Sequence, residues 1–274
     1  MSRTLKLSDC GITVDTIWQM SRRLLAACSR ILAVALIACL PILVAAEPQT
    51  LARHASLHAS EGFSDTALIN GFYRTVFGLE HDGGGIGANI VKKFSGPVRL
   101  YVDDRSEARR GLTVEQFAGT LESIVSGLDL EVVDDPVNAN FTVYVVGRSA
   151  YAQTIRDDVY ASPEAPIRGR CMVRVITLVS GINRAQAVIV ADEGDFLFTR
   201  CMIEEILQGL GPLNDDSTLA ASVFNDTSTH TVFTLYDRYL LNMLYHPHIK
   251  AGMTRKEVDL VINAVLDDVR QTVR

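Results

Sequence analysis

The chain has 274 residues, 48% of them hydrophobic, so it is long enough to enclose a substantial core. Its formal net charge is −6, which excludes the strongly basic surface on which non-specific binding to nucleic acid depends. We therefore expect a globular protein whose partners are not nucleic acids.

The first part of the chain has the pattern of an export signal. An apolar run at residues 31–46 follows a segment with three arginines and ends in small residues, which is typical of a secretory signal peptide. The run is shorter than the roughly 20 residues of a membrane-spanning helix. We predict a signal peptide over residues 1–46, with Met20 as a possible true start. An uncleaved anchor and a lipid anchor at Cys39 are the alternatives, and only they would attach the protein to a membrane.

Removal of residues 1–46 changes both the charge and the cysteine content. Five basic and two acidic side chains leave with this segment, so the remaining chain carries a formal charge of −9. Of the five cysteines, only Cys171 and Cys201 remain. A single pair in an exported protein favours a disulfide, and two separate buried thiols are the alternative. We expect residues 47–62 to be a flexible leader and residues 63–274 to form one domain in the periplasm or outside the cell.

The hydrophobic patterns predict helices and strands in a mixed order. Helices are predicted at 63–77, 113–128, 196–210, 233–245 and 254–273. The segment 148–160 is polar, and a helix is the most regular structure that we expect there. Strands are predicted at 98–102, 130–133, 141–146, 171–179 and 185–191. The spacing of Thr113 to Gln116, and of Thr254 to Glu257, is that of a capping box. This order favours an α+β fold in which a mixed, twisted sheet packs against the helix at 196–210, with further helices at the C-terminal end.

The segment 201–215, CMIEEILQGLGPLND, is the most informative stretch. Its apolar residues recur at the spacing of one helix face, and its polar residues occupy the other faces. Gly211 and Pro212 predict the end of the helix, because glycine adopts the left-handed conformation readily and proline cannot continue the turn.

The polar residues of this helix carry a family resemblance. The order Glu204-Glu205-x-x-Gln208-x-x-Gly211-x-x-Asn214-Asp215 resembles the HExxHxxGxxH helix of zinc metallopeptidases of the metzincin type. The segment Ser222-Val223-Phe224 resembles the Met-turn, with Phe224 at the methionine position, and 233–245 resembles the closing metzincin helix. The chain is also similar to uncharacterised exported bacterial domains. The resemblance implies a zincin-like fold, in which the sheet lies against the metal-bearing helix.

The resemblance also assigns positions to individual residues. Glu204, Gln208 and Asn214 stand where the three zinc ligands are expected, Glu205 keeps the general-base position, and Asp215 completes the polar set. Neutral amides are poor zinc ligands, and such oxygen donors suit calcium better. The resemblance therefore implies a degenerate site without a cofactor, although zinc or calcium stays possible. Three histidines elsewhere are alternative ligands: His230, His246 and His248.

Two functions follow from this resemblance. The first is a non-catalytic module that binds a cell-envelope polypeptide in the inherited cleft, where metzincin substrates lie along an edge strand. The second is an unconventional metal-dependent peptidase or hydrolase with Glu205 as general base. A third interpretation is an unrelated α+β domain, in which strands 98–102 and 185–191 would not share a sheet beside helix 196–210.

Overall fold

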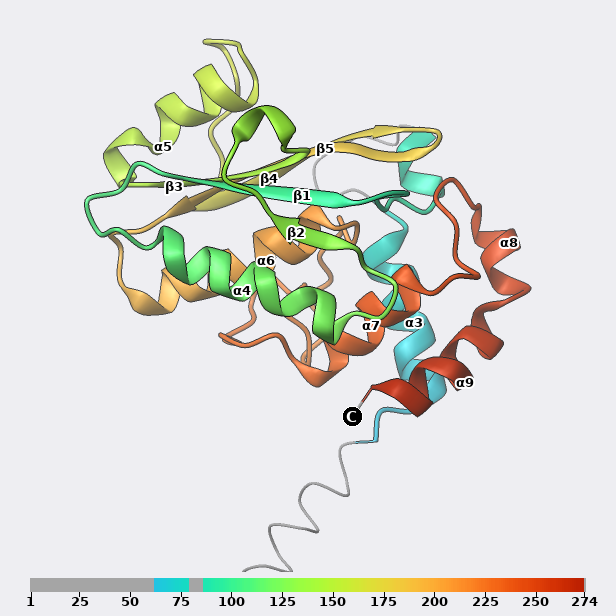
Figure 1. Cartoon of the computed structure of the whole chain (residues 1–274). Helices are drawn as coiled ribbons and strands as arrows, with labels where there is room; N and C mark the ends of the chain where they lie inside the picture. The colour runs from blue at the N-terminus through green and yellow to red at the C-terminus, as the bar shows by residue number, and fades with distance from the viewer. Residues whose placement is uncertain (1–61, 79–85, 274) are drawn as a thin grey trace, which may run out of the picture. The chain divides into compact units, whose positions relative to one another are not determined.

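A five-stranded sheet forms the centre of the described residues, 62–78 and 86–273 of a computed structural model (Figure 1). The strand order is β2-β1-β3-β5-β4. The strands are β1 (Val98–Asp104), β2 (Leu130–Val132), β3 (Phe141–Val146), β4 (Cys171–Leu178) and β5 (Gly181–Val190). All neighbouring pairs are parallel except β4 and β5, which form an antiparallel hairpin and place β4 at one edge. The signal segment and leader lie outside the described residues, so their boundaries stay predictions.

Helices cover both faces of the sheet. On one face, α4 (Gly111–Ile124) packs against β1 and β2, and α6 (Asp195–Gly209) packs against β4 and β5 (Figure 1). On the other face, α5 (Arg148–Thr154) and a π-helical turn at Ile155–Val159 contact β3 and β5. Because both faces are covered, β3 and the last six residues of β5 consist almost entirely of buried apolar side chains.

The remaining helices form a group beside the sheet. The helices α3 (Asp65–Val76), α7 (Leu235–Tyr245) and α9 (Ile262–Thr272) contact one another, and α8 (Arg255–Asp259) precedes α9. Two consecutive buried lysines connect this group to the rest of the domain. Lys92 Nζ donates to the carbonyls of Val76 and Gly78 at the end of α3, and Lys93 Nζ donates to the carbonyl of Leu244 in α7. These contacts satisfy carbonyls that a helix leaves unpaired at its C-terminus.

The structure corrects two predicted helices. The helix predicted at 113–128 is α4, which begins at Gly111 without a side-chain cap from Thr113. Its N-terminus is capped from β1, because Asp104 accepts a hydrogen bond from the Gly111 amide at 2.7 Å. The predicted helix 254–273 has the expected capping box at Thr254 but is divided into α8 and α9. The break follows Asp259, whose carboxylate accepts a hydrogen bond from Tyr73 of α3. The first correction arises from a contact distant in sequence.

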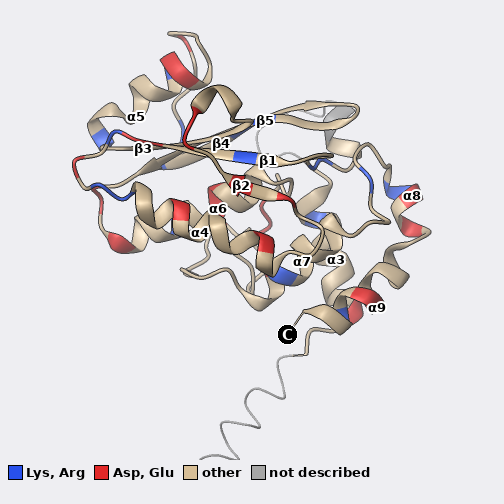
Figure 2. Cartoon of the chain, viewed as in Figure 1, with Lys and Arg blue, Asp and Glu red and all other residues tan. Residues whose placement is uncertain are grey.

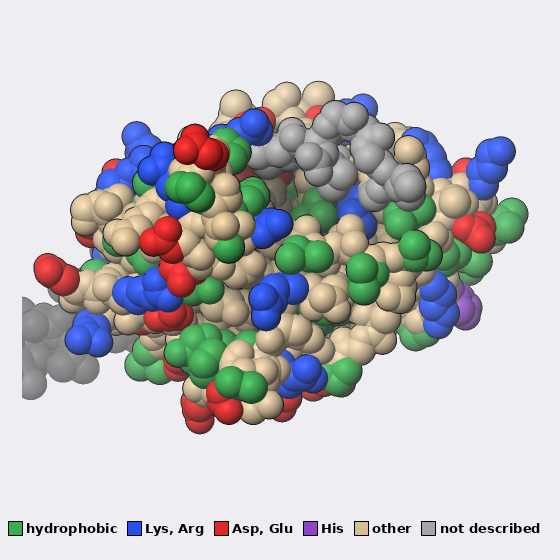
Figure 3. Space-filling model, turned by 90° about the horizontal axis from the view of Figure 1, so that it is seen from above, with side chains coloured by type: hydrophobic (Ala, Val, Ile, Leu, Met, Phe, Trp, Pro, Cys, Tyr) green, Lys and Arg blue, Asp and Glu red, His purple; other side chains and the backbone are tan. Residues whose placement is uncertain are grey.

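The fold class is therefore α+β with a mixed sheet, as predicted. The strands predicted at 98–102 and 185–191 belong to β1 and β5 of the same sheet, and α6 lies against that sheet. Lys and Arg residues are spread along many elements and interspersed with Asp and Glu residues (Figure 2). The face seen in Figure 3 likewise mixes hydrophobic side chains with charges of both signs. Among the described residues, no helix combines the length and apolar character needed to cross a bilayer.

Candidate functional site

The central helix α6 packs closely against the sheet. Its apolar residues Ile206 and Leu207 are fully buried. At Gly209 a Cβ atom would lie 2.3 Å from the ring of Phe141 in β3, so no larger residue permits this approach. Gly211 follows the helix with a φ of 139°, as expected for the residue after a helix end. The close packing also buries the polar residues of the helix.

Glu204 is one of these buried polar residues. Only 6% of its surface is exposed, so this polar residue is shielded from solvent. Arg200, one turn earlier, donates a hydrogen bond to Glu204 at 3.1 Å and lies 3.4 Å from the carbonyls of Asn225 and Asp226. A buried carboxylate with an arginine partner avoids most of the cost of removing an isolated charge from water. The position that the resemblance assigns to the first zinc ligand is thus occupied by an internal ion pair.

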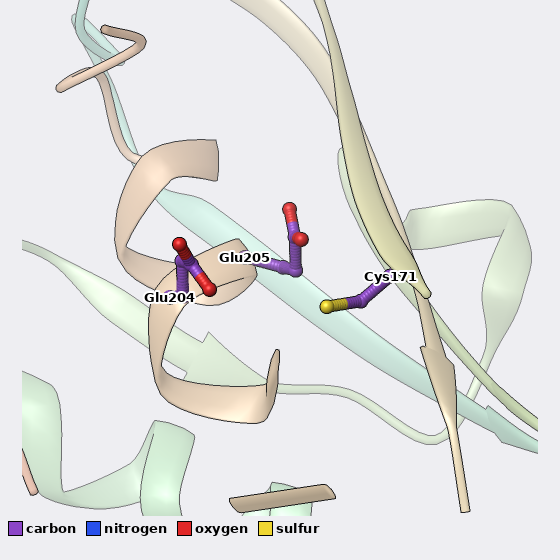
Figure 4. Close-up of side chains that lie close together, drawn as sticks. All are labelled: Cys171, Glu204 and Glu205. Atoms are coloured by element: carbon purple, nitrogen blue, oxygen red, sulfur yellow. The ribbon is translucent and has the colours of Figure 1, made fainter. Parts of the chain in front are cut away.

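Glu205 points toward the start of β4 (Figure 4). It is 6% exposed, and its carboxylate, that of Glu204 and the sulfur of Cys171 lie within 4.8 Å of one another. Burial raises the pKa of the Tyr151 hydroxyl, and the negative charge of Glu205 raises it further. Cys171 forms a disulfide with Cys201 of α6, as predicted, with the two Cα atoms 5.8 Å apart. In this oxidised form the sulfur is no thiolate and cannot serve as a zinc ligand.

The remaining polar residues of the motif divide into two groups. Gln208 donates from Nε2 to Asp215 at 2.7 Å, so these two predicted residues come together. Asn214 instead donates from Nδ2 to the carbonyl of Arg74 in α3 at 2.8 Å. Its amide group therefore holds the loop after α6 against α3. Each of the three positions implied as metal ligands makes a different contact within the protein.

The segment predicted as the Met-turn equivalent is tied to the next helix. Phe224 is fully buried, and Ser222 donates to Asp237 of α7 at 2.5 Å. The same carboxylate accepts hydrogen bonds from the Val223 amide at 3.1 Å and from the Thr234 hydroxyl at 2.6 Å. Burial raises the pKa of Asp237, and these hydrogen bonds oppose the rise. The sequence did not single out Asp237 as the residue that binds this segment to α7, although the spacing of Thr234 and Asp237 at the helix start was visible.

Sequence reasoning also missed a cleft between α3 and α8. This cavity of about 440 Å³ is lined by polar residues that include Arg255, Arg74, Asp216 and Asn214. Arg255 lies over the ring of Tyr73 at 4.3 Å, and Arg74 pairs with Asp216 at 2.5 Å. These residues come from segments far apart in the chain, so no local pattern could have indicated the cleft.

The donor set at α6 fits a catalytic zinc poorly. Such a zinc takes three protein ligands, commonly histidine and carboxylate, and keeps one position for water. The described histidines make contacts elsewhere: His230 Nε2 lies 2.9 Å from the carbonyl of Ala220, and His246 lies 3.4 Å from Asp268. Burial and the neighbouring His248 lower the pKa of His246. The arrangement at α6 can hold a network of ion pairs and hydrogen bonds without a metal.

The fold and the site together define an α+β domain with a disulfide-linked central helix that carries buried carboxylates. The family model described as "Protein of unknown function (DUF2927)" matches residues 65–264, and the chain belongs to this family. A comparison with curated proteins finds no match.

Proposed function

We propose that this protein is a non-catalytic, zincin-like module of the cell envelope that binds an extended polypeptide along β4, beside α6. The observation that carries the proposal is the engagement of the three implied ligand positions within the protein. Glu204 pairs with an arginine, Gln208 with an aspartate, and Asn214 with a backbone carbonyl. A site with these internal partners favours binding over metal-dependent hydrolysis.

Three further features support the zincin-like relationship. The helix with the motif lies against the sheet, and the strand next to it is an antiparallel edge strand. The buried segment Ser222–Phe224 is held by the helix that follows it. The family resemblance implies that the sheet lies against the motif helix and that substrates lie along an edge strand. The disulfide is compatible with export from the reducing cytosol.

The edge strand β4 is suited to receive a peptide. Among residues 62–78 and 86–273, β4 pairs only with β5. Seven of its eight residues are partly exposed rather than buried, and Leu178 and Val179 at the hairpin turn are largely exposed. An extended peptide that adds to such an edge gains main-chain hydrogen bonds without the need for a preformed deep pocket.

The first test is metal analysis of residues 47–274 under non-reducing conditions. The protein is purified without chelator and again dialysed against zinc, calcium and manganese. We expect no stoichiometric metal in any sample. Near-stoichiometric metal that is lost on Glu204→Ala would refute the non-catalytic proposal.

The second test locates a bound peptide. Peptides selected from a display library should bind in the presence of chelator and slow hydrogen exchange in β4. The amides of β2, the opposite edge strand, serve as the internal control and should exchange at an unchanged rate. Protection that spares residues 171–178 would refute binding along β4.

One observation favours a second candidate, a metal-dependent hydrolase. Glu205 is buried beside another carboxylate and stands at the position that the resemblance assigns to the general base. This candidate requires activity that depends on added metal and is abolished by Glu205→Gln. Binding of the selected peptides should survive the same substitution if the first proposal is correct.

A further inference from the structure

The sulfur of Cys171 and two carboxylates meet where β4 begins beside the middle of α6 (Figure 4). The Cys171 sulfur lies within 4.8 Å of an oxygen of Glu204 and an oxygen of Glu205, which lie within the same distance of each other. The fourth atom is the sulfur of Cys201, to which Cys171 is bonded. Cys201 is fully buried and both glutamates are 6% exposed, so the group is largely shielded from water.

We propose that reduction of the disulfide converts this group into a zinc site, with Cys171, Cys201, Glu204 and Glu205 as the four ligands. The site differs from the set implied by the zincin resemblance, because it uses neither Gln208 nor Asn214. It goes beyond the proposed peptide-binding function and does not depend on it, since that function belongs to the oxidised protein.

A dithiol is one reductant that can open the disulfide. A reductant thiolate attacks the sulfur of Cys171, which is more exposed than Cys201. The bond between the two cysteines breaks, the second reductant thiol closes its own disulfide, and the protein gains two thiols. Zinc then binds both sulfurs and displaces one proton from each, so two protons are released for every ion bound.

The geometry needs only a short movement. With zinc–sulfur bonds of about 2.3 Å, tetrahedral coordination places two ligand sulfurs about 3.8 Å apart. The Cα atoms of the cysteines are 5.8 Å apart, so rotation of the side chains can bring the sulfurs to this separation. The carboxylate oxygens, already within 4.8 Å of Cys171, need to approach it by roughly 1 Å.

The charges and the ligand types select the ion. Two thiolates and two carboxylates carry a formal charge of −4, which zinc and the neighbouring Arg200, 3.1 Å from Glu204, reduce to −1. Thiolates are soft donors that favour zinc over calcium or magnesium. In the oxidised protein neither sulfur is negative, so the same four residues should not retain zinc.

The proposal is tested with the mature chain, residues 47–274, in oxidised form and after reduction by a phosphine that is removed under nitrogen. Cobalt is titrated as a spectroscopic substitute, and zinc is measured by elemental analysis. We expect the reduced protein to bind one equivalent of metal and to show the charge-transfer absorption of a cobalt–thiolate bond. The oxidised protein should show neither.

Variants assign the ligands. Cys171→Ser and Cys201→Ser should each weaken the charge-transfer absorption and lower zinc affinity. Glu205→Gln should keep the absorption but reduce zinc affinity about tenfold or more. Mutation of a residue that only supports a metal ligand already costs about tenfold to hundredfold in affinity. The exposed carboxylate of Glu193 is the matched control, and Glu193→Gln should bind zinc as the wild type does.

Circular dichroism shows whether each sample is folded. A reduced chain that keeps its fold without binding zinc would overturn the proposal. So would a reduced chain that unfolds even with zinc present, because the metal should replace the lost covalent link. Equal zinc binding by the oxidised and reduced forms would also overturn it.

Discussion

Replacement of Lys92 by methionine should destabilise the domain strongly. The side chain is 1% exposed, and its Nζ donates to the carbonyls of Val76 at 3.0 Å, Gly78 at 3.1 Å and Ile90 at 3.4 Å. Methionine preserves most of the packing volume but leaves these carbonyls without their donor. Since one hydrogen bond to a charged group contributes about 1.5–3 kcal/mol, we expect Lys92→Met to lower the free energy of unfolding by about 3 kcal/mol.

Urea denaturation at pH 7, followed by circular dichroism, measures this loss. The matched control is Lys256→Met, because Lys256 is an exposed residue of α8 and its change should stay within about 0.5 kcal/mol. Equal urea midpoints for Lys92→Met and the wild type, at unchanged slope, would refute the reasoning that Lys92 satisfies the end of α3.

The pH dependence of the free energy of unfolding gives an independent check on the burial of Lys92. Burial lowers the pKa of Lys92 to about 8, and burial with nearby Lys250 lowers that of Lys93 to about 8. The ordinary value is 10.5, so above about pH 8 the unfolded chain binds protons that the folded chain has released. Stability contributed by these groups therefore rises between pH 8 and 10. The rise should be smaller in Lys92→Met, and an unchanged slope would show that Lys92 does not titrate in this range.

Three further changes test the packing around the site. Gly211→Ala should lower the free energy of unfolding by more than about 3 kcal/mol, because a Cβ would lie 2.1 Å from the Lys92 carbonyl oxygen at a φ of 139°. The control Gly194→Ala, at a φ of 96° with open space around it, should cost about 1–2 kcal/mol. Equal urea midpoints for the two variants would contradict the clash at Gly211. Asp237→Asn should cost about 1–3 kcal/mol, since an amide nitrogen then faces hydrogen-bond donors, and thermal unfolding at unchanged midpoint would exclude its tethering role. Reduction of the disulfide without metal should cost about 3–4 kcal/mol for a separation of 30 residues, and overlapping denaturation curves would show that the link adds no stability.

Local patterns predicted much of the secondary structure. Strand β3 was predicted with its observed bounds, because an uninterrupted apolar run between turn residues is typical of a buried strand. The end of α6 shortly before Gly211 was also visible, because the conformation that Gly211 adopts is favourable only for glycine. The start of α4 was not, because its cap comes from Asp104 of β1 rather than from the helix itself.

The candidate site also combines features that local sequence indicates with features that only the packing decides. Sequence spacing placed Glu204, Glu205 and Gln208 near one another on α6, because residues four apart share a helix face. It could not show that all three are buried, because burial depends on the close approach of the helix to β3 and β5.

The sequence by itself determined the α+β class and the motif on the central helix, and it favoured the pairing of Cys171 with Cys201. These follow from hydrophobic period, residue identity and the number of cysteines, which are properties of neighbouring residues or of composition. Only the tertiary structure decided which polar side chains from different segments meet, including Asn214 with Arg74 of α3 and the Asp237 contacts of the buried turn. A hydrogen bond depends on distances of a few ångströms between segments, and those distances arise only when the sheet and its helices pack together.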